Sequence, residues 1–375
     1  MNLAIVGCGF VADYYLATAT LHPELVIVGI HDRVAERAAA LGAAYGLPVY
    51  PTLHDVCKDA RVEMVLNLTN PRSHYEVSKA GLLAGKHVYS EKPLAMTMVE
   101  ATELVAIAEQ RGLRLASAPC SVLGETAQAV LKALREKAVG TVRVVYAEMD
   151  DGMVHRMNYR SWKSVSGVPW PYKDEFEIGC TLEHAGYYLT WLVAMFGAAE
   201  SVTSFASVQV PDKVPGETLS MVSPDFSVAC ILFRSGVVAR LTCGILAPHD
   251  HVMKVVGDDA VLYVPDSWDY RSPVYVRRWI TIRRKTFLSP WRDKRALARA
   301  PYGAIRTKGS QSMDFCRGPA ELAAAVKAGR PSRLSAQFAL HVTELALAIH
   351  DAPRHGSSHR MATDVEAIEP MPWAA

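Results

Sequence analysis

The chain has 375 residues, of which 50% are hydrophobic and 21% charged, and its formal net charge is +2. This balance is typical of a globular protein and excludes a disordered one, and no apolar run approaches the ~18 residues that a membrane helix needs. The first apolar strand begins almost at Met1, which leaves no room for a secretory leader, so we expect a cytoplasmic protein that does not enter membranes. The length predicts two domains, because single cores seldom grow beyond about 250–300 residues.

The first part of the chain alternates predicted strands with predicted helices. Ser73 and Thr97, each followed three residues later by a glutamate, predict capping boxes at two of the helices. The strands are short, rich in β-branched residues and almost continuously apolar, which is typical of a parallel sheet covered on both faces. This pattern predicts an α/β domain over residues 1–119 with a doubly wound parallel sheet. The expected strands cover residues 2–6, 24–32, 62–69, 86–90 and 113–118.

The pattern changes after residue 119. A long helix is predicted over 123–138, and several of the strands that follow alternate apolar and polar residues, as in an antiparallel sheet with one covered face. Two more helices are predicted over 319–328 and 337–350, and the tail from Ala352 is expected to be loosely ordered. We therefore expect a second α/β domain over 120–375 with a mostly antiparallel sheet. Its strands are expected over 141–149, 201–208, 226–233, 237–245, 251–257, 260–265 and 274–284.

The turn between the first strand and the first helix carries a glycine-rich motif, Gly-Cys-Gly-Phe-Val-Ala. Its first glycine permits a tight turn, its second lets the backbone approach a pyrophosphate, and the small alanine lets the helix pack on the strand. The free N–H groups of the helix N-terminus then face the phosphates. The motif predicts a dinucleotide site whose residues include Gly7, Gly9, Phe10, Val11 and Ala12.

The end of the second strand indicates which dinucleotide is bound. Asp32 lies at about the expected distance after the glycine motif, where a carboxylate can bind the hydroxyls of the adenine ribose. This carboxylate favours NAD, because it would repel the 2′-phosphate of NADP. Arg33 beside it keeps NADP open as the alternative cofactor, since an arginine there can pair with that phosphate.

Two further polar motifs follow later strands of the predicted sheet. Ligands of open parallel sheets bind at the carboxyl ends of the strands, so both motifs are expected to line the cofactor. Taken alone, a Glu-Lys-Pro sequence is more often a surface turn before a helix. The two motifs supply Thr69, Asn70, His74, Glu91 and Lys92 as candidate cofactor-binding residues.

Together these motifs resemble the Gfo/Idh/MocA oxidoreductase family. The N-terminal fingerprint, the Thr-Asn-Pro-x-x-His sequence and the Glu-Lys-Pro sequence about twenty residues later carry the resemblance, which covers essentially the whole chain. It implies a Rossmann domain, a second α/β domain whose sheet forms a homodimer or homotetramer, and hydride transfer between NAD(P) and a sugar, polyol or nucleotide-sugar. It also implies that Lys92 is the catalytic lysine.

An apolar helix predicted early in the second domain carries Glu183, His184 and Tyr187 near its start. Members of the family typically have Asp-x-Gly-x-His there, so Glu183 takes the acid position and Tyr187 the histidine position, with alanine in place of glycine. Helical spacing places Glu183 and Tyr187 on one face, with His184 turned away. A tyrosine at this position resembles the glucose–fructose oxidoreductase branch. A Lys92 ammonium ~4 Å from the Tyr187 oxygen would favour the phenolate of Tyr187 by up to ~4 kcal/mol at an effective dielectric of ~20. The residues predicted to be catalytic are Lys92, Tyr187 and Glu183.

The loop before this helix mixes aromatic rings with cations, which suits a sugar ring that carries an anionic group. The same aromatics could equally be packing residues of an ordered loop. Between Arg271 and Lys308, twelve lysines and arginines stand against a single acid, so this segment either attracts an anion or forms a solvated strand edge. We expect a small sugar-type substrate that is phosphorylated, nucleotide-linked or carboxylated. The candidate substrate-binding residues are Arg156, Tyr159, Trp162, Lys173 and His184.

Several other sites and functions are weighed from the same sequence. The seven cysteines form no Cys-x-x-Cys pair, and the His249/His251 pair has no third ligand in the sequence, so we expect neither a disulfide nor a metal site. The basic segment lacks the interleaved aromatics of a nucleic-acid module, so no nucleic-acid partner is expected. A non-catalytic NAD(P)-binding regulator and an NAD-dependent glycosidase stay open as alternatives to a dehydrogenase.

Overall fold

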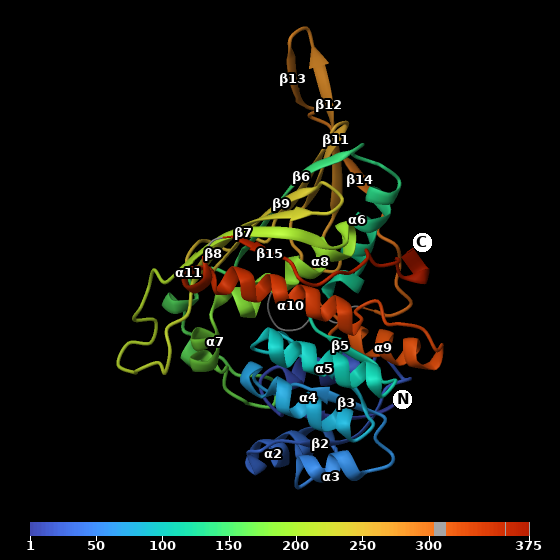
Figure 1. The fold of residues 1–375 in the computed structure, drawn as a ribbon, viewed down its shortest axis with the longest axis vertical. Helices are drawn as coiled ribbons and strands as arrows, with labels where there is room; N and C mark the ends of the chain where they lie inside the picture. The colour runs from blue at the N-terminus through green and yellow to red at the C-terminus, as the bar shows by residue number, and fades with distance from the viewer. Residues whose placement is uncertain (304–312, 357, 375) are drawn as a thin grey trace. The chain divides into compact units, whose positions relative to one another are not determined.

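The computed structural model describes residues 1–303, 313–356 and 358–374, which form two compact units (Figure 1). Each unit combines segments from different parts of the chain. The sequence analysis divides the chain once, between residues 119 and 120. It therefore assigns to the second domain two later segments that the structure groups with the first unit. The first unit consists of Met1–Cys120, Met157–Ile178 and Asp314–Leu347, and the second of Ser121–Arg156, Gly179–Met313 and Ala348–Ala375.

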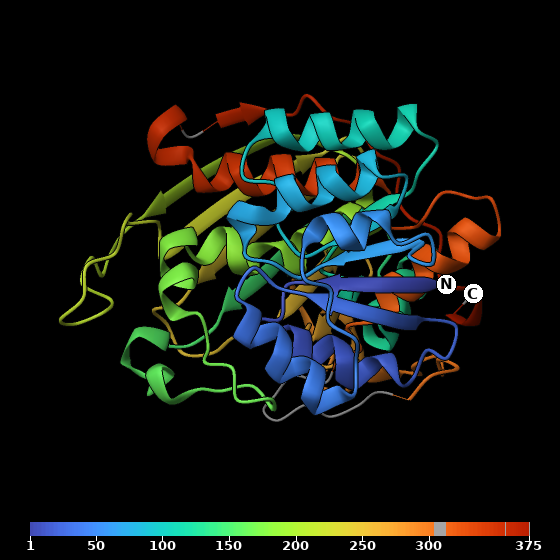
Figure 2. The same ribbon diagram turned by 90° about the horizontal axis from the view of Figure 1, so that it is seen from below.

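The first unit is built on a five-stranded parallel sheet in the order β2-β1-β3-β4-β5. A single parallel bridge from Val49 to Ile30 extends the sheet beyond β2, which gives the strand order of a Rossmann fold. Figure 2 shows helices on both faces of these strands. The predicted doubly wound parallel sheet is confirmed. The bounds are β1 Asn2–Val6, β2 Val26–His31, β3 Met64–Asn67, β4 His87–Ser90, β5 Leu115–Ser117, α1 Ala12–Ala19, α2 Ala35–Tyr45, α3 Leu53–Lys58, α4 His74–Leu83 and α5 Met98–Gln110.

One of the two predicted helix caps is present. Thr97 accepts a hydrogen bond from the main-chain N–H of Glu100 at 3.2 Å, as predicted for α5. Ser73 does not cap α4, because Pro71–Ser73 is already a 3₁₀ turn in which the serine has helical backbone angles and no side-chain cap bond. Proline is preorganised for the first turn of a helix, so it starts the helical backbone before the position that the capping pattern indicates.

Two later segments join the first unit through buried polar contacts. Asp13 is 3% exposed and accepts hydrogen bonds from the hydroxyl of Ser166 at 2.6 Å and from its main-chain N–H at 3.2 Å. Asp314 Oδ2 lies 2.8 Å from His22 Nε2, and both side chains are fully buried. Among the helices of the described ranges, none is long and apolar enough to cross a bilayer. The helices in these segments are α7 Tyr172–Ile178, α9 Arg317–Lys327 and α10 Ala336–His350.

The second unit is built on a ten-stranded sheet in the order β13-β12-β11-β10-β6-β9-β8-β7-β15, with β14 paired to β12. β6 and β9 run parallel, and the other neighbouring strands run antiparallel. The predicted mostly antiparallel sheet is confirmed. The bounds are β6 Val142–Asp150, β7 Ala199–Ser207, β8 Phe226–Phe233, β9 Val238–Gly244, β10 Met253–Gly257, β11 Ala260–Val264, β12 Val274–Ile282, β13 Lys285–Leu288, β14 Asp293–Arg295 and β15 Ser358–Arg360.

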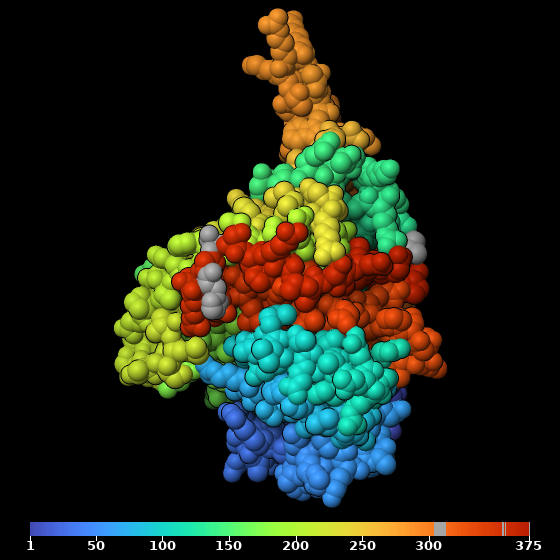
Figure 3. Space-filling view, in the orientation of Figure 1, coloured from blue at the N-terminus to red at the C-terminus, as the bar shows by residue number. Residues whose placement is uncertain are grey.

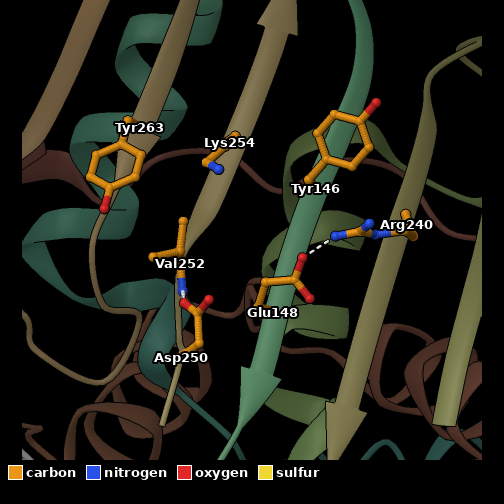
Figure 4. A pocket seen from close by; sticks show the side chains of 7 residues that line it. All are labelled: Tyr146, Glu148, Arg240, Asp250, Val252, Lys254 and Tyr263. Carbon is orange, nitrogen blue, oxygen red and sulfur yellow. Dashed lines mark hydrogen bonds and ion pairs between the residues drawn. The ribbon is translucent and has the colours of Figure 1, made fainter. Parts of the chain in front are cut away.

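The two faces of this sheet differ in exposure. Helices α6 (Glu125–Arg135) and α8 (Gly186–Phe196) lie on one face (Figure 1), and every second strand residue is buried there. The opposite, outer face carries a pocket of about 450 Å³. Figure 4 shows Arg240 paired with Glu148 in this pocket, and the Arg240 guanidinium lies 5.0 Å from the centre of the Tyr146 ring.

Strands β12 and β13 form a hairpin that projects from the end of the sheet (Figure 3). Much of the basic segment lies on this hairpin and on β14. Some of its cations are used locally: Arg277 donates to the Ser289 carbonyl at 2.8 Å, and Arg292 lies over the Tyr275 ring. Two further members of the segment, Arg306 and Lys308, lie outside the described residues.

The C-terminal tail packs on the second unit, so the expectation of a loosely ordered tail is wrong for its described part. β15 adds an antiparallel strand beside β7, and the Met371 main-chain N–H donates to Gln128 Oε1 at 2.7 Å. Met371 and Ile368 are buried. Widely spaced apolar residues on irregular backbone have no helical or strand period, which is why the sequence pattern missed them.

Candidate active site

The turn from β1 into α1 keeps an open space above the main chain. Gly7 has a φ of +104°, and a Cβ there would lie 2.5 Å from main-chain atoms of the turn after β3, so glycine is required. A Cβ at Gly9, by contrast, would meet no described atom within 4 Å. This space at the start of α1 suits the phosphates of a ligand. Phe10 and Val11 are partly exposed in the same turn, and Ala12 is fully buried.

Asp32 holds the loop after β2 in place. Its Oδ2 accepts a hydrogen bond from the Cys8 N–H at 2.7 Å, and its Oδ1 accepts one from the Val34 N–H at 2.8 Å. A cavity of about 320 Å³ lies beside it, with Arg33 and Tyr50 among its lining residues. Burial, with Asp32 close by, raises the pKa of the Cys8 thiol to about 12, so this thiol stays protonated.

The turn after β3 is held by buried side chains. The Asn67 amide donates to the His74 carbonyl at 3.0 Å, and its carbonyl oxygen accepts from the Thr69 hydroxyl at 2.7 Å. His74 is fully buried, with ring nitrogens 2.6 Å from the Pro93 carbonyl and 2.9 Å from the Thr69 carbonyl, so it ties two loops together. Burial lowers the pKa of His74 despite these acceptors. Asn70 Oδ1 is buried and accepts no hydrogen bond from the described residues, so it is available to a ligand.

Lys92 is the second residue after β4 and is partly exposed. The buried carboxylate of Glu91 accepts hydrogen bonds from the Tyr15 hydroxyl at 2.7 Å and from the Lys92 main-chain N–H at 3.0 Å. Burial and the Glu91 charge raise the pKa of the Tyr15 phenol well above its ordinary value, so Tyr15 donates as a neutral phenol. Glu91 thus fixes the main chain at Lys92.

The helix that carries Tyr187 begins with a π-helical turn, Thr181–Ala185, which leads into α8. A π turn contains more residues than an α turn, so it changes which side chains share a face. Glu183 is 4% exposed, whereas His184 and Tyr187 are partly exposed. Both rings contact Trp268, with centroids 6.2 Å away for His184 and 5.0 Å away for Tyr187. Tyr187 and His184 therefore both contact Trp268.

The neighbouring Tyr188 has a different role. It is fully buried, and its hydroxyl donates to the His251 carbonyl at 2.5 Å. Burial raises the pKa of this phenol well above its ordinary value. Of the two adjacent tyrosines, Tyr187 is the one that a ligand can reach.

The predicted substrate loop is largely an aromatic cluster within the first unit. Tyr159 is 4% exposed, and its ring centroid lies 5.2 Å from that of Tyr172 and 5.3 Å from that of Phe176. Trp162 is half-buried, with its ring centroid 5.0 Å from that of Trp170. These contacts agree with the alternative that the aromatic residues pack an ordered loop. The remaining two loop candidates, Arg156 of the second unit and Lys173 of the first, are exposed.

Two residues of this region, Trp268 and Asp151, were not predicted from the sequence. The Trp268 ring contacts His251 at a centroid distance of 4.5 Å as well as Tyr187, and Asp151 Oδ2 lies 3.6 Å from His184 Nε2. Burial raises the pKa of Asp151 to about 6. The acid at the end of one predicted strand and the His-x-His pair at the start of another were visible, but their proximity depends on strand pairing, which the sequence does not give.

Two family profiles match the chain. The N-terminal match, described as an oxidoreductase family with an NAD-binding Rossmann fold, covers residues 1–118, and the GFO/IDH/MocA C-terminal domain covers residues 127–263. The first unit thus contains an NAD-binding Rossmann domain of the oxidoreductase class. The chain belongs to the Gfo/Idh/MocA family.

Individual relatives agree with this assignment. The chain is 25% identical over 229 residues to an uncharacterized oxidoreductase of Synechocystis, and the match spans 60% of each protein. It is 23% identical over 271 residues to the mouse trans-1,2-dihydrobenzene-1,2-diol dehydrogenase, with 72% of this chain and 75% of the mouse protein covered. An Agrobacterium radiobacter oxidoreductase, solved with NAD+, L-tartaric acid and magnesium, has the same fold, with a TM-score of 0.77, 16% identity and coverage of 96% of this chain and 98% of that one.

Proposed function

We propose that the protein is an NAD(P)-dependent oxidoreductase that moves a hydride between the nicotinamide and a secondary alcohol or ketone of a sugar, polyol or nucleotide-sugar. The observation that carries the proposal is the placement of Tyr187, an accessible phenol at the start of α8 whose neighbour Tyr188 is buried. Lys92 supports it, because this partly exposed lysine is the second residue after β4, at the edge of a parallel sheet where ligands bind.

The residues of the first unit fit a dinucleotide. The space at Gly9 suits the pyrophosphate, Asp32 and its cavity suit the adenine ribose, and Asn70 Oδ1 can accept a hydrogen bond from a hydroxyl or amide of the ligand. NAD(P), when bound, accepts or supplies the hydride. We propose NAD as the preferred form, because Asp32 would repel the extra phosphate of NADP, although Arg33 lines the same cavity.

Tyr187 and Lys92 are the two residues to which we assign the acid–base chemistry. Tyr187 exchanges the proton of the reacting hydroxyl, and the Lys92 ammonium supplies a positive charge, which favours the ionised form of a hydroxyl. In the reductive direction, a neutral Tyr187 already holds the proton that the product alcohol needs. Glu183 remains a proposed catalytic residue, and its burial in the π turn suits an indirect role through the position of Tyr187.

The substrate class follows from the relatives and from the site. The mouse relative is named for a vicinal diol, which supports a substrate with adjacent secondary hydroxyls. The basic segment gives little support to an anionic substrate, because much of it lies on a projecting hairpin and some of its cations pair locally. We therefore propose a polyol or sugar-type substrate without requiring an anionic group.

We propose that the outer face of the second unit's sheet forms a homodimer. Four hydrophobic side chains, one on each of four neighbouring strands, are exposed there, and an exposed apolar surface is typical of an interface. Sedimentation should give a dimer that Leu232→Arg converts to a monomer, and a monomeric wild-type protein would contradict the proposal. The four residues are Tyr146, Phe205, Leu232 and Val238.

The test of the function is a screen of NAD+ and NADP+ reduction over sugars, polyols, uronic acids and nucleotide-sugars. Products should be detected by mass as well as by NADH absorbance, because a tightly held cofactor can hide turnover. The expected result is oxidation of a secondary hydroxyl at a rate that depends on Tyr187. Cofactor binding without turnover on any substrate would favour the regulator, and release of a sugar without net NADH would favour the glycosidase.

A further inference from the structure

Three side chains of the second unit converge on one point. Asp151, His249 and His251 each offer one metal-ligand atom, and the three atoms lie within 4.8 Å of one another. His251 Nε2 lies 3.7 Å and His249 Nδ1 lies 3.9 Å from the same oxygen, Asp151 Oδ1. Direct hydrogen bonds would be about 2.7–3.2 Å long, so the three groups face a shared space and do not simply pair.

The strand pairing explains how these residues meet. β6 ends at Asp150, which forms an antiparallel bridge with Asp250, and Asp250 lines the pocket on the outer face. Successive side chains of extended chain point to opposite faces. Asp151 and His251, one residue further along each segment, therefore point to the inner face, on which α8 lies.

His251 provides an independent observation that points to a ligand. Its side chain is 1% exposed, and neither ring nitrogen forms a hydrogen bond with the described residues. Nδ1 lies 3.5 Å from Asp266 Oδ1, while Nε2 faces Asp151. A carboxylate behind one ring nitrogen and a metal ion on the other is the arrangement that orients a ligating histidine.

We propose that Asp151, His249 and His251 bind one divalent transition-metal ion of the Zn²⁺ type. Metal–ligand bonds of about 2.0–2.2 Å place two ligands of a tetrahedral ion about 3.3 Å apart. The two histidine nitrogens lie 3.7 and 3.9 Å from Asp151 Oδ1, and all three atoms lie within 4.8 Å of one another, so the side chains need to move closer together to bind the ion. Two imidazoles with one carboxylate favour Zn²⁺, Co²⁺ or Fe²⁺, whereas Mg²⁺ and Ca²⁺ prefer oxygen ligands.

The site also has a place for a fourth ligand. Three protein ligands leave a position for water or substrate, and the side chain of His249 is 45% exposed, which gives access. Trp268 contacts both His251 and Tyr187, so the ion would lie on the Tyr187 side of the unit. If the proposed function holds, the open position takes a substrate oxygen near the reacting hydroxyl.

The experiment is a metal titration of the untagged full-length protein. The protein is treated with a chelator, dialysed, and titrated with Zn²⁺ by calorimetry and with Co²⁺ by visible absorption. We expect one equivalent bound, with Co²⁺ bands of a nitrogen- and oxygen-ligated ion. His249→Ala should weaken binding at least tenfold and abolish the rise in melting temperature that Zn²⁺ produces in the wild type. Since His249 is exposed, this variant is expected to fold, and circular dichroism checks that it does.

The matched control is His54→Ala, which removes an exposed histidine of α3 in the first unit. Binding by His54→Ala should equal that of the wild type, and Asp151→Asn should behave like His249→Ala. Binding well below one equivalent, or equally tight binding by folded His249→Ala, would overturn the proposal. The titration needs no substrate, so it decides the metal site even if the screen finds no turnover. With an active enzyme, removal of the metal should raise KM for the substrate and leave NAD affinity unchanged.

Discussion

The buried polar groups around the glycine turn of the first unit and those around His251 of the second are held in different ways. In the first unit, Asp32 accepts two main-chain N–H groups, Glu91 accepts a phenol and an N–H, and His74 lies between two carbonyls. In the second unit, His251 has no hydrogen bond from either ring nitrogen within the described ranges, and Asp151 stands more than 3.5 Å from its imidazole neighbours.

This difference separates polar groups with a structural role from polar groups that can bind a ligand. Side chains that already form hydrogen bonds within the chain hold loops in place, so they shape the space around a ligand. Buried side chains without partners lose hydrogen-bonding energy unless a ligand supplies it. In the first unit, changes to the backbone of the glycine turn are therefore expected to be harmful. In the second unit, ligand binding and catalysis are expected to depend on individual side chains.

The largest expected effect tests the two proposed catalytic side chains, Tyr187 of the second unit and Lys92 of the first. Tyr187→Phe removes the proposed proton-transfer group, and Lys92→Ala removes the proposed catalytic charge, so each should lower kcat by about 10²–10⁴-fold. NAD binding, measured by fluorescence titration, should change little.

The neighbouring tyrosine gives the matched control. Tyr188→Phe removes one buried hydrogen bond to the His251 carbonyl, which should reduce stability by about 1–3 kcal/mol and leave kcat within a few-fold of wild type. If Tyr188→Phe loses turnover and Tyr187→Phe keeps it, the roles of the two residues are exchanged and our assignment fails.

Two glycine variants test whether the shape of the turn between β1 and α1 is needed for folding and for NAD binding. Gly7→Ala places a methyl group 2.5 Å from main-chain atoms at a positive φ, so it should unfold at a lower temperature, with a loss of about 2–5 kcal/mol. Gly9→Ala has room for its methyl group and should keep the wild-type melting temperature, but the methyl group fills the proposed phosphate space, so NAD should bind at least tenfold more weakly. Equal NAD affinities of Gly9→Ala and wild type would place the pyrophosphate elsewhere.

A smaller effect is expected for cofactor choice. Asp32→Ser removes the carboxylate that would repel a 2′-phosphate while Arg33 remains in the same cavity, so kcat/KM should shift toward NADP+ by about tenfold. The serine also removes two hydrogen-bond acceptors of the loop, so thermal unfolding is measured in parallel. An unchanged NAD/NADP ratio with normal stability would mean that Asp32 is structural only.

The smallest effect concerns Asp13, which holds the segment Met157–Ile178 to the rest of the first unit through Ser166. Burial opposes ionisation of Asp13, but hydrogen bonds from Ser164, Ser166 and Tyr45 outweigh it and lower the pKa of Asp13. Its contribution to stability is thus present above the unfolded-state pKa of about 3.9 and is lost as the pH falls below it. Asp13→Asn should reduce stability by about 1 kcal/mol at pH 7, and the gap from wild type should narrow near pH 3 in denaturant titrations. A gap that widens in acid would contradict this sign.

The sequence predicted the features that depend on neighbouring residues. The glycine turn, the carboxyl-end motifs, both sheets and seven of the ten strands of the second unit's sheet were predictable because their signals are local or periodic. The cap at Ser73 failed because Pro71 starts the helical backbone earlier. The π turn at Thr181–Ala185 was not expected, because a π turn has no recognisable sequence pattern.

The features that were missed depend on contacts between distant parts of the chain. Asp151 meets His251 through the pairing of strands about a hundred residues apart, and Trp268 reaches Tyr187 from another loop. The aromatic residues around Tyr159 gave a composition that suited either a sugar or a core, and only their burial separates the two. Asp314 and His22 are almost three hundred residues apart and leave no local trace of their contact.

The return of residues 314–347 to the first unit has a consequence for protein engineering. A fragment that stops at Cys120 would lack Asp314, and the buried His22 ring would lose its carboxylate partner. The hydrogen bond from Cys316 to Thr18 would be lost as well. Chimeras that exchange cofactor preference between relatives should therefore transplant both stretches together, since a crossover placed after the last parallel strand alone would join mismatched halves of one hydrophobic core.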